Sequence, residues 1–435
     1  MISDGDRSPK KILVISHSYY PLNEARAYRW TEISGEWVRQ GHEVDVVCGK
    51  TSDSKELEEV EGVTVYRAYN PMAKLRPTNH HKATHSEKSS EKKVITGIKT
   101  CIKKVWKFFR WPDSECLWVF SAVKKVRALL REKKYDAVVS VSLPFSSHIV
   151  WKLAKIGISY SPVWICDIGD PFSIMKDTPL NNYRIYRRLN HIAEKNIVNS
   201  ASAVTVTNPK ITEEYLNIFQ LDKSSVICIP PMLSINFDHL EGGKENNGMD
   251  TVKLRYFGAL YKNIRDPSYL LEFLSKLKVN MRGVDIEMSF YGELEDCIDI
   301  INKYKMSGQE WVSANGHVAR DQIPSMMVDA DILINIGNRT SFQLPSKIVE
   351  YVASGKKILH VSLIEDDSVV KLLGDYPYFC NIHEKNEVDV NDINRVREFI
   401  LNDDPVDQEI ISNYSKPFLS SEISKQYIEL INNKS

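Results

Sequence analysis

A lysine and a glutamate stand one helical turn apart in a segment that could hold an anion. Lys347 and Glu350 follow a polar stretch that ends in Pro345 and Ser346, and Gly355 closes the run. Proline is tolerated in the first turn of a helix, serine can cap it, and glycine adopts the left-handed conformation that ends it. The first turn presents free backbone N–H groups, to which the lysine adds a full charge. These residues predict a short helix that binds a phosphate, with Glu350 accepting hydrogen bonds from sugar hydroxyls.

Further residues for such a site follow the strand expected at 253–257. Gly258 would let the backbone approach a ligand closely because it has no side chain. Arg265 stands in the next loop, where its planar guanidinium could engage two phosphate oxygens at once, and Lys262 is a second cation there. The structural alternative for Arg265 is a surface ion pair with Asp266 or a nearby acid.

Length and composition set the frame for these residues. A chain of 435 residues exceeds the size at which one core keeps growing, so two domains of about 200 residues each are expected. Lysine plus arginine equals aspartate plus glutamate, at 57 each, which argues against a general nucleic-acid binder. The seven cysteines lack CxxC spacing, and no signal peptide or run of 18 apolar residues occurs. We therefore expect a reduced, cytoplasmic protein.

Short apolar runs alternate with helical spacing through the chain. In the first half, strands are expected at 11–16, 41–48, 63–66, 137–140, 163–166 and 203–206, with a helix at 27–40. After a polar, glycine-containing stretch at 241–248, a second series is expected at 253–257, 287–291, 312–315, 332–335 and 357–362. This alternation predicts an α/β protein with two mostly parallel sheets, whose ligands bind at the carboxyl ends of the strands.

Several motifs, taken in order, resemble the GT-B glycosyltransferases and in detail glycosyltransferase family four. In the first half they are Tyr19-Tyr-Pro-Leu, Arg39-Gln-Gly-His-Glu-Val-Asp-Val and Asp167-Ile-Gly-Asp-Pro-Phe172. In the second half they are Phe257-Gly-Ala-Leu-Tyr261 with Arg265, Tyr291-Gly-Glu293, Asn315-Gly-His-Val318, Ala330-Asp-Ile332 and Pro345-Ser-Lys-Ile-Val-Glu-Tyr351.

The resemblance implies two Rossmann-like, doubly wound domains that face a cleft. The acceptor-side domain would span 1–235, with a basic amphipathic insert at about 78–118, and the nucleotide-sugar domain would span 250–412. Residues 413–435 would cross back to the first domain. The implied reaction moves a sugar from a UDP- or GDP-linked donor to an acceptor glycan or lipid-linked glycan with retention of configuration. It implies no cofactor and no metal.

The family's donor-site residues carry over onto matching positions. Arg265 and Lys347 would stabilise the diphosphate, Arg265 standing where the family usually has lysine. The resemblance also places Gly258, Gly292, Gln343, Leu344, Pro345, Ser346 and Glu350 at the nucleotide sugar, with Glu350 on the ribose. Lys262 could bind there as a substitute for an arginine that the family often has after the glycine. Ala259 stands where an arginine is common, and Phe342 stands at the first of the family's two paired glutamates.

Two carboxylates and one loop are the candidates in the first half. Asp167 follows an apolar strand where many family members carry a histidine, and Asp170 follows three residues later. Either could polarise an acceptor hydroxyl or bind the donor sugar, or simply cap a turn. Asn23, Arg26 and Arg29 begin a helix where relatives approach the diphosphate, so they could lie on the acceptor or phosphate side, or on an ordinary surface turn.

Residues 94–110 form a basic amphipathic pattern. Apolar residues recur at helical spacing among lysines, which indicates contact with an anionic membrane surface at its inner face; an ordinary core-covering helix is the alternative. The preceding residues 78–93 are polar and expected to be mobile.

Three functions fit these observations. The first is a glycosyltransferase in surface polysaccharide or glycolipid assembly. A sugar-nucleotide 2-epimerase with the same architecture is the second. The third is a non-catalytic GT-B subunit that binds a partner transferase, which the substitutions at Ala259 and Phe342 would suit.

Overall fold

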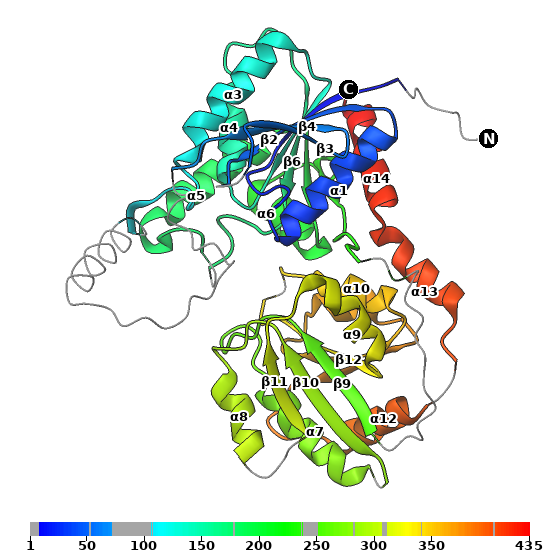
Figure 1. Cartoon of the computed structure of the whole chain (residues 1–435). Helices are drawn as coiled ribbons and strands as arrows, with labels where there is room; N and C mark the ends of the chain where they lie inside the picture. The colour runs from blue at the N-terminus through cyan, green and yellow to red at the C-terminus, as the bar shows by residue number, and fades with distance from the viewer. Residues whose placement is uncertain are drawn as a thin grey trace, which may run out of the picture. The chain divides into compact units, whose positions relative to one another are not determined.

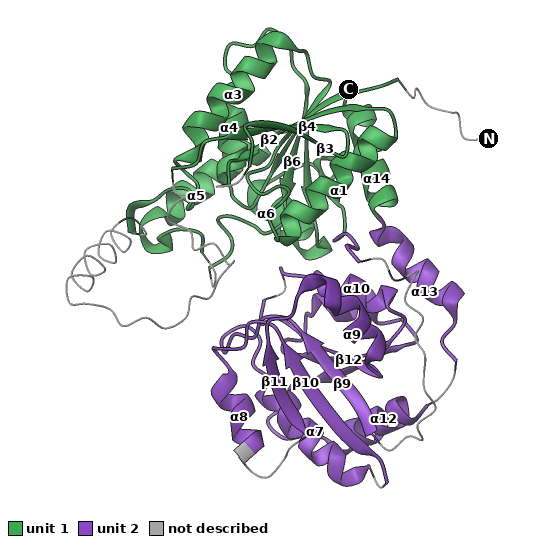
Figure 2. Ribbon diagram, in the orientation of Figure 1, with its two compact units in different colours: residues 1–230, 420–435 green, residues 231–419 purple. Residues whose placement is uncertain are grey.

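The computed structural model describes residues 8–51, 54–71, 106, 108–176, 179–235, 237, 251–281, 283–306, 311–340, 342–402 and 405–435. The chain divides into two compact units, which are distinguished by colour in Figure 2. Unit 1 comprises residues 1–230 and 420–435, and unit 2 comprises residues 231–419.

The described residues of unit 1 form an eight-stranded sheet in the order β3-β4-β2-β1-β5-β6-β7-β8 (Figure 1). Every neighbouring pair is parallel except β3 with β4. The strands are β1 (Lys11–Ile15), β2 (Glu43–Gly49), β3 (Leu57–Val60), β4 (Val63–Ala68), β5 (Ala137–Val141), β6 (Val163–Ile168), β7 (Ala203–Val206) and β8 (Val226–Cys228).

Helices cover both faces of this sheet. The chain leaves β1 toward β2 on one side and β5 toward β6 on the other, so right-handed crossovers place the helices α1 and α4 on opposite faces. The last helix, α14, lies beside α1 (Figure 1). The helices of unit 1 are α1 (Ala25–Arg39), α3 (Trp118–Glu132), α4 (Ser146–Ala154), α5 (Tyr183–Val198), α6 (Pro209–Phe219) and α14 (Ser420–Lys434), with a 3-10 turn η2 at Lys223–Ser225.

Unit 2 is built on a six-stranded sheet, as far as its residues are described. All its pairs are parallel, in the order β11-β10-β9-β12-β13-β14. The order of chain entry is therefore 3-2-1-4-5-6, which is the doubly wound Rossmann order with its switch point between β9 and β12. The strands are β9 (Thr251–Phe257), β10 (Asp285–Tyr291), β11 (Val312–Gly316), β12 (Ile332–Ile336), β13 (Lys357–Ser362) and β14 (Phe379–His383).

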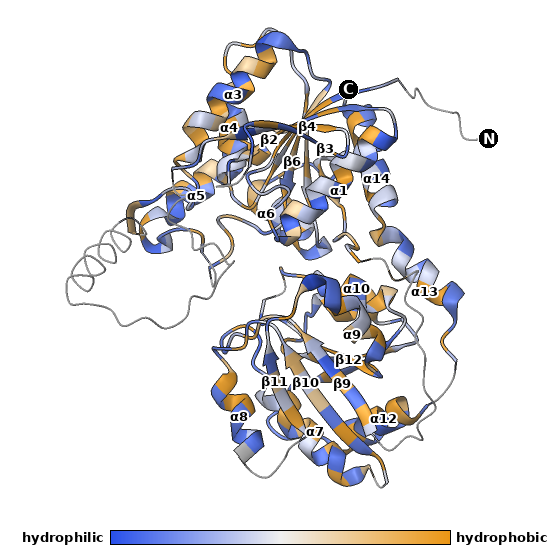
Figure 3. Cartoon of the chain, in the orientation of Figure 1, coloured by the Kyte–Doolittle hydropathy of each residue, from blue (hydrophilic) through white to orange (hydrophobic). Residues whose placement is uncertain are grey.

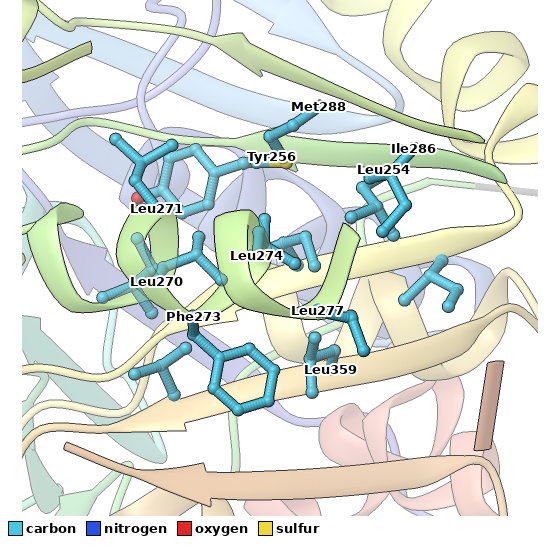
Figure 4. Packing of buried hydrophobic residues seen from close by; sticks show 14 of the residues in the cluster. Leu254, Tyr256, Leu270, Leu271, Phe273, Leu274, Leu277, Ile286, Met288 and Leu359 are labelled. Atoms are coloured by element: carbon cyan, nitrogen blue, oxygen red, sulfur yellow. The ribbon is translucent and has the colours of Figure 1, made fainter. Parts of the chain in front are cut away.

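Two apolar clusters sandwich the sheet of unit 2. Alternate residues of β9 point to opposite faces, so Leu254 and Tyr256 join one cluster while Phe257 joins the other. This alternation gives the banded hydropathy along the strand in Figure 3. Figure 4 shows Leu270, Leu274 and neighbouring residues of α7 packed onto the first face. The helices of unit 2 are α7 (Ser268–Asn280), α8 (Ile298–Met306), α9 (Ile323–Asp329), α10 (Lys347–Ala353), α11 (Ser368–Leu373), α12 (Val390–Leu401) and α13 (Gln408–Ser415), with 3-10 turns η3 (Arg320–Gln322) and η4 (Lys416–Phe418).

The predicted α/β class and the named strands are confirmed. Strands β3, β8 and β14 were not predicted, because they are short or carry mixed polar and apolar residues. Unit 2 starts at residue 231 and runs to 419, whereas the predicted segment returning to the first domain began at 413. Phe418 and Tyr414 pack into the second apolar cluster of unit 2, which accounts for the later start of that segment.

Some expectations concern residues that the structure does not describe. Of the amphipathic segment 94–110, only 106 and 108–110 are described, and residues 78–93 lie outside the described residues as well. Ser341, the second serine that could cap the helix at Lys347, is also outside them. Among the described residues, none of the helices has the length and hydrophobicity needed to cross a bilayer.

Candidate functional site at the switch point of unit 2

Two loops meet at the carboxyl ends of β9 and β12, on either side of the switch point. Arg265 comes from the loop after β9, and Asn338 follows β12. Arg265 Nε donates to Asn338 Oδ1 over 2.6 Å, and Arg265 Nη1 donates to the Ala259 carbonyl over 3.4 Å. Asp266 accepts from the Ser268 backbone instead of pairing with Arg265. Arg265 thus ties together the two loops where a Rossmann-like sheet binds its ligand.

Lys347 opens α10 in the segment after β12. Its side chain is largely desolvated, and this burial lowers the pKa of Lys347 to about 8. Glu350 acts to raise this pKa, whereas the positive charges of Arg265 and Arg320 act to lower it further. Lys347 therefore lies within electrostatic range of two arginines and one glutamate in a partly desolvated corner, where the positive charges would favour an anionic ligand.

Glu350 lies on the same helix and is 9 % exposed. Its Oε1 accepts a hydrogen bond from Ser234 Oγ over 2.6 Å, and Arg320 Nη2 donates to the same serine oxygen over 2.6 Å. Arg320 and Glu350 are also 3.9 Å apart. Burial raises the pKa of Glu350, while Ser234 and Arg320 oppose that shift. The predicted ribose carboxylate is thus reached by a serine from the start of unit 2 and an arginine from the turn η3.

The polar stretch before α10 surrounds these charges. The Gln343 carbonyl accepts from Asn338 Nδ2 over 3.2 Å and from Ser368 Oγ over 3.3 Å, so backbone contacts hold this residue. Leu344 packs against the second apolar cluster, and Pro345 is buried. Ser346 is exposed and its side chain makes no capping hydrogen bond, so the expected serine cap is wrong for this residue. Gly355, with φ of 67°, ends the helix as predicted.

Lys262 is exposed and pairs with Asp299 at 2.9 Å. In the structure, Lys262 therefore serves in an ion pair on the surface. A contact between Lys262 and a ligand stays a prediction.

Gly258 and Gly292 bring two strand ends close together. A Cβ on Gly292 would lie 2.1 Å from the Gly258 carbonyl oxygen, and Gly292 has a φ of 130°. Only glycine fits such an approach. These residues therefore shape the strand ends beside Arg265 through the backbone.

Asp167, at the end of β6 in unit 1, is 1 % exposed. Its Oδ1 accepts from Thr205 over 2.8 Å and from Tyr427 over 2.7 Å. Its Oδ2 accepts from Trp30 Nε1 and Arg26 Nη1, both over 3.3 Å. With both oxygens occupied in this way, Asp167 acts as a buried anchor, and a direct role in chemistry stays a prediction.

Arg26 crosses over Gly169 to reach Asp167. A Cβ on Gly169 would lie 0.7 Å from Arg26 Nη2, so the glycine makes room for the guanidinium. Arg29 is buried, and its Nη1 donates to the Pro230 carbonyl over 2.7 Å. Asn23 is exposed just before α1. Of these three residues, the structure brings only Arg26 to a predicted catalytic carboxylate.

Asp170 differs from Asp167 in its surroundings. It is half-buried, and no described residue donates a hydrogen bond to its carboxylate. The loop that follows is held by Glu194 of α5, which accepts from the backbone nitrogens of Phe172 and Ser173 over 2.8 Å each. Asp170 is therefore the more available of the two predicted carboxylates.

A buried polar cluster at the strand ends of unit 1 was not predicted. His17, two residues after β1, lies 3.2 Å from Glu115, and Asn70 donates to the same carboxylate oxygen over 2.5 Å. Asp113 accepts from the backbone and hydroxyl of Ser146 over 2.8 and 2.7 Å. His17, Asn70, Glu115 and Asp113 are all under 5 % exposed. Their hydrogen bonds therefore stabilise the ends of the strands from inside the unit. No spacing pattern could have revealed contacts between segments so far apart in sequence.

Ser234, Arg320 and Asn338 were also missed. Arg320 stands two positions after the Asn315-Gly-His-Val318 motif, and this closeness to a motif could have identified it as a site residue. Ser234 stands in a segment that matches no motif. Among the described residues, no group of three or more His, Cys, Asp or Glu side chains could hold a metal ion.

Each of the two units has a mostly parallel, doubly wound sheet, and the second carries a cationic corner at its switch point. These features are those of the GT-B glycosyltransferase fold. Residues 27–236 match the family described as Glycosyltransferase Family 4, so the first half of the chain resembles that family. The fold and this match together support a glycosyltransferase of the GT-B type and do not favour the epimerase or the non-catalytic subunit. No curated protein sequence matches the chain.

Solved structures share the architecture over nearly the whole chain. A sucrose-phosphate synthase from Thermosynechococcus elongatus has 13 % identity and a TM-score of 0.63, with 98 % of each chain covered. Anabaena HepE in complex with UDP and glucose has 12 % identity and a TM-score of 0.58, covering 97 % of this chain and 99 % of that one. The catalytic domain of starch synthase IV from Arabidopsis thaliana, bound to ADP and acarbose, has 11 % identity and a TM-score of 0.60, covering 98 % and 99 %. At these identities the likeness concerns the fold.

Proposed function

We propose that this protein transfers a sugar from a nucleotide-diphosphate sugar to an acceptor hydroxyl, with retention of the anomeric configuration. The observation that carries the proposal is the convergence of Arg265, Lys347 and Arg320 at the switch point of unit 2. Glycosyl transfer needs stabilisation of a departing diphosphate while the anomeric carbon gains positive charge. Fixed cations in a desolvated corner meet that need without a metal or further cofactor.

The roles of the donor-site residues follow from their chemistry. Lys347 and Arg265 would bind the diphosphate oxygens, the arginine being held by Asn338 in one orientation. Glu350 would accept hydrogen bonds from the ribose in place of Ser234. Gln343 and the backbone around Gly258 and Gly292 would line the sugar. The complexes of HepE with UDP and of starch synthase IV with ADP support a nucleotide ligand for this fold.

In unit 1, Asp170 would contact the acceptor hydroxyl or the donor sugar, and Asp167 would hold Arg26 in place. Retention is proposed from the family resemblance of residues 27–236. The acceptor is proposed to be a glycan or lipid-linked glycan in surface polysaccharide or glycolipid assembly. The basic pattern at 94–110 is the sequence feature that motivates contact with a membrane, at the cytoplasmic face.

The test is incubation of the full chain with a panel of UDP-, GDP- and dTDP-sugars, with and without candidate lipid-linked and free glycan acceptors. Nucleotide release that requires an acceptor supports transfer, and NMR of the product's anomeric proton tests retention. Replacing Lys347 by Met should lower kcat about 10²- to 10³-fold, the usual cost of removing one group that stabilises transition-state charge. The exposed Lys276, replaced by Gln, is the matched control. Full turnover without Lys347 would refute the proposed role.

A further inference from the structure

Helix α5 carries a row of large apolar side chains on its outer surface. Ile185, Leu189 and Ile192 are 49 %, 43 % and 63 % exposed. No other helix among the described residues has three exposed large apolar side chains. Single exposed apolar residues are common on soluble proteins, but a row of them on one helix indicates a binding surface.

Helix geometry puts these three residues on the side of α5 that faces away from unit 1. At 3.6 residues per turn, positions i, i+4 and i+7 fall on one side. The residues that α5 buries, which include Asn190 and Glu194, fall on the opposite side. The row is therefore outward-facing and does not complete the core.

The charged residues on this outer surface are all basic. Arg184, Arg188 and Lys195 are exposed and lie along one flank of the apolar row, whereas Arg187 is exposed on the opposite side of the helix. The single acidic residue of α5, Glu194, is fully buried. None of the four basic side chains forms an ion pair with a described residue. This local excess stands out in a chain whose formal net charge is zero.

Two more exposed rings stand beside α5. Phe108 and Phe109 are 48 % and 62 % exposed, with ring centroids 5.0 Å apart. The Tyr186 hydroxyl on α5 donates to the Phe109 carbonyl over 2.8 Å, which fixes this pair against the helix. Two exposed aromatic rings therefore lie beside α5, on the flank that carries Tyr186.

We propose that the outer face of α5, together with Phe108 and Phe109, docks on an anionic lipid bilayer. A bilayer surface offers acyl chains to the apolar row and negative headgroups to Arg184, Arg188 and Lys195, which is the pattern that interfacial helices show. Charge complementarity selects this occupant over a second copy of the chain, because two such surfaces brought face to face would oppose like charges. This inference stands on α5 and does not depend on the proposed chemistry or on residues 94–105.

The docked helix would also lie next to the predicted acceptor loop. The opposite side of α5 carries Glu194, which holds the backbone of Phe172 and Ser173 beside Asp170. One helix thus separates the proposed bilayer contact from that carboxylate. On the proposed function, this arrangement would suit an acceptor held in the membrane.

Vesicle flotation of the full chain tests the proposal. The wild-type chain should float with phosphatidylcholine vesicles that contain phosphatidylglycerol, should not float with phosphatidylcholine alone, and should be released by added salt. Ile185→Ser/Leu189→Ser/Ile192→Ser and, separately, Arg184→Gln/Arg188→Gln/Lys195→Gln should each weaken binding at least tenfold. Each basic residue near the surface is worth about fivefold in affinity.

The control variants remove exposed apolar and basic side chains from unit 2 instead of from α5. Val279→Ser removes an exposed apolar side chain from unit 2, and Lys276→Gln/Lys305→Gln/Lys371→Gln removes three exposed charges there. Both should bind vesicles as the wild type does. Circular dichroism checks that every variant is folded.

The proposal is overturned if the wild-type chain fails to float with anionic vesicles, or if both α5 variants bind them as well as the controls do. It is also overturned if sedimentation shows a wild-type dimer that the apolar variant dissociates while vesicle binding is unchanged. Loss of vesicle binding with transfer to a water-soluble acceptor intact would separate this surface from the proposed catalytic function.

Discussion

The Tyr427 hydroxyl donates a hydrogen bond to Asp167 Oδ1 over 2.7 Å and joins the last helix of unit 1 to the end of β6, 260 residues earlier in the chain. The Tyr427 ring also meets Trp30 and Trp37 at centroid distances of 5.3 and 6.1 Å. Trp30 Nε1 donates to Asp167 as well. The final helix is thereby coupled to the carboxylate that holds Arg26.

Tyr427→Phe removes this hydroxyl and keeps the ring. The free energy of unfolding of unit 1 should fall by about 1.5–3 kcal/mol, the usual worth of a buried hydrogen bond to a charged group. Denaturant titration followed by tryptophan fluorescence measures this, because only Trp311 lies outside unit 1. Tyr186→Phe, which loses a bond to an exposed carbonyl, is the control and should cost about 1 kcal/mol or less. Equal costs in the two variants would argue against Asp167 as a buried anchor.

Lys347 predicts an alkaline limit to activity. Because its pKa is lowered from 10.5 to about 8, the free protein loses this positive charge as the pH rises through about 8. We expect kcat/KM for the sugar nucleotide to fall above that pH, since this ratio reports ionisations of the free enzyme. Lys347→Arg keeps the charge and should move the fall to higher pH. An unchanged profile in this variant would assign the limit to another group.

The same pKa has a consequence for stability. Between about pH 8 and 10.5 the folded Lys347 binds fewer protons than it does in the unfolded chain, so its contribution to the free energy of unfolding rises with pH over this window. Below about pH 8 the desolvated charge is present in full and opposes folding. Lys347→Met should therefore flatten this part of the stability profile of unit 2, measured by circular dichroism.

Glu350 and Ser234 make a pair with opposite expected effects on nucleotide binding. If ribose hydroxyls replace Ser234 as donors to Glu350, Glu350→Ala should weaken nucleotide binding about 10- to 100-fold, as the loss of a hydrogen bond to a charged group would. Ser234→Ala should leave the affinity equal or higher, because it removes the competitor. Isothermal titration with UDP, GDP and ADP measures both. A comparable loss in both variants would mean that the serine itself contacts the nucleotide.

Gly292 provides a test of the close approach between strand ends. Gly292→Ala places a Cβ 2.1 Å from the Gly258 carbonyl oxygen and should destabilise unit 2 by about 2 kcal/mol more than Gly283→Ala does. Gly283 also has a positive φ, 79°, but open space around its Cβ position, so its substitution costs about 1–2 kcal/mol of backbone strain alone. Thermal unfolding followed by circular dichroism compares the two. Equal shifts would show that the backbone conformation, and not the contact, requires glycine at 292.

Much of the fold could be predicted because it rests on local patterns. A buried parallel strand reads as a short apolar run, and a glycine with positive φ ends a helix wherever it occurs, as Gly355 does. The strand β3 escaped prediction because none of its residues Leu-Glu-Glu-Val, at the sheet edge, is buried. Hydrophobic periodicity reports which residues are buried, and an exposed edge strand buries few residues.

The amino-acid order alone specified the strands, the two-unit organisation and the chemical types of Arg265, Lys347 and Glu350, since each depends on near neighbours in the chain. Folding in three dimensions decided which groups surround them: Ser234 against Glu350 across 116 residues, Asn338 against Arg265 across 73, and Tyr427 against Asp167 across 260. A single sequence carries no local signal for such pairs, because sheet topology brings them together only after distant strands align. Burial, which lowers the pKa of Lys347 and turns Asp167 into an anchor, arises from the same assembly.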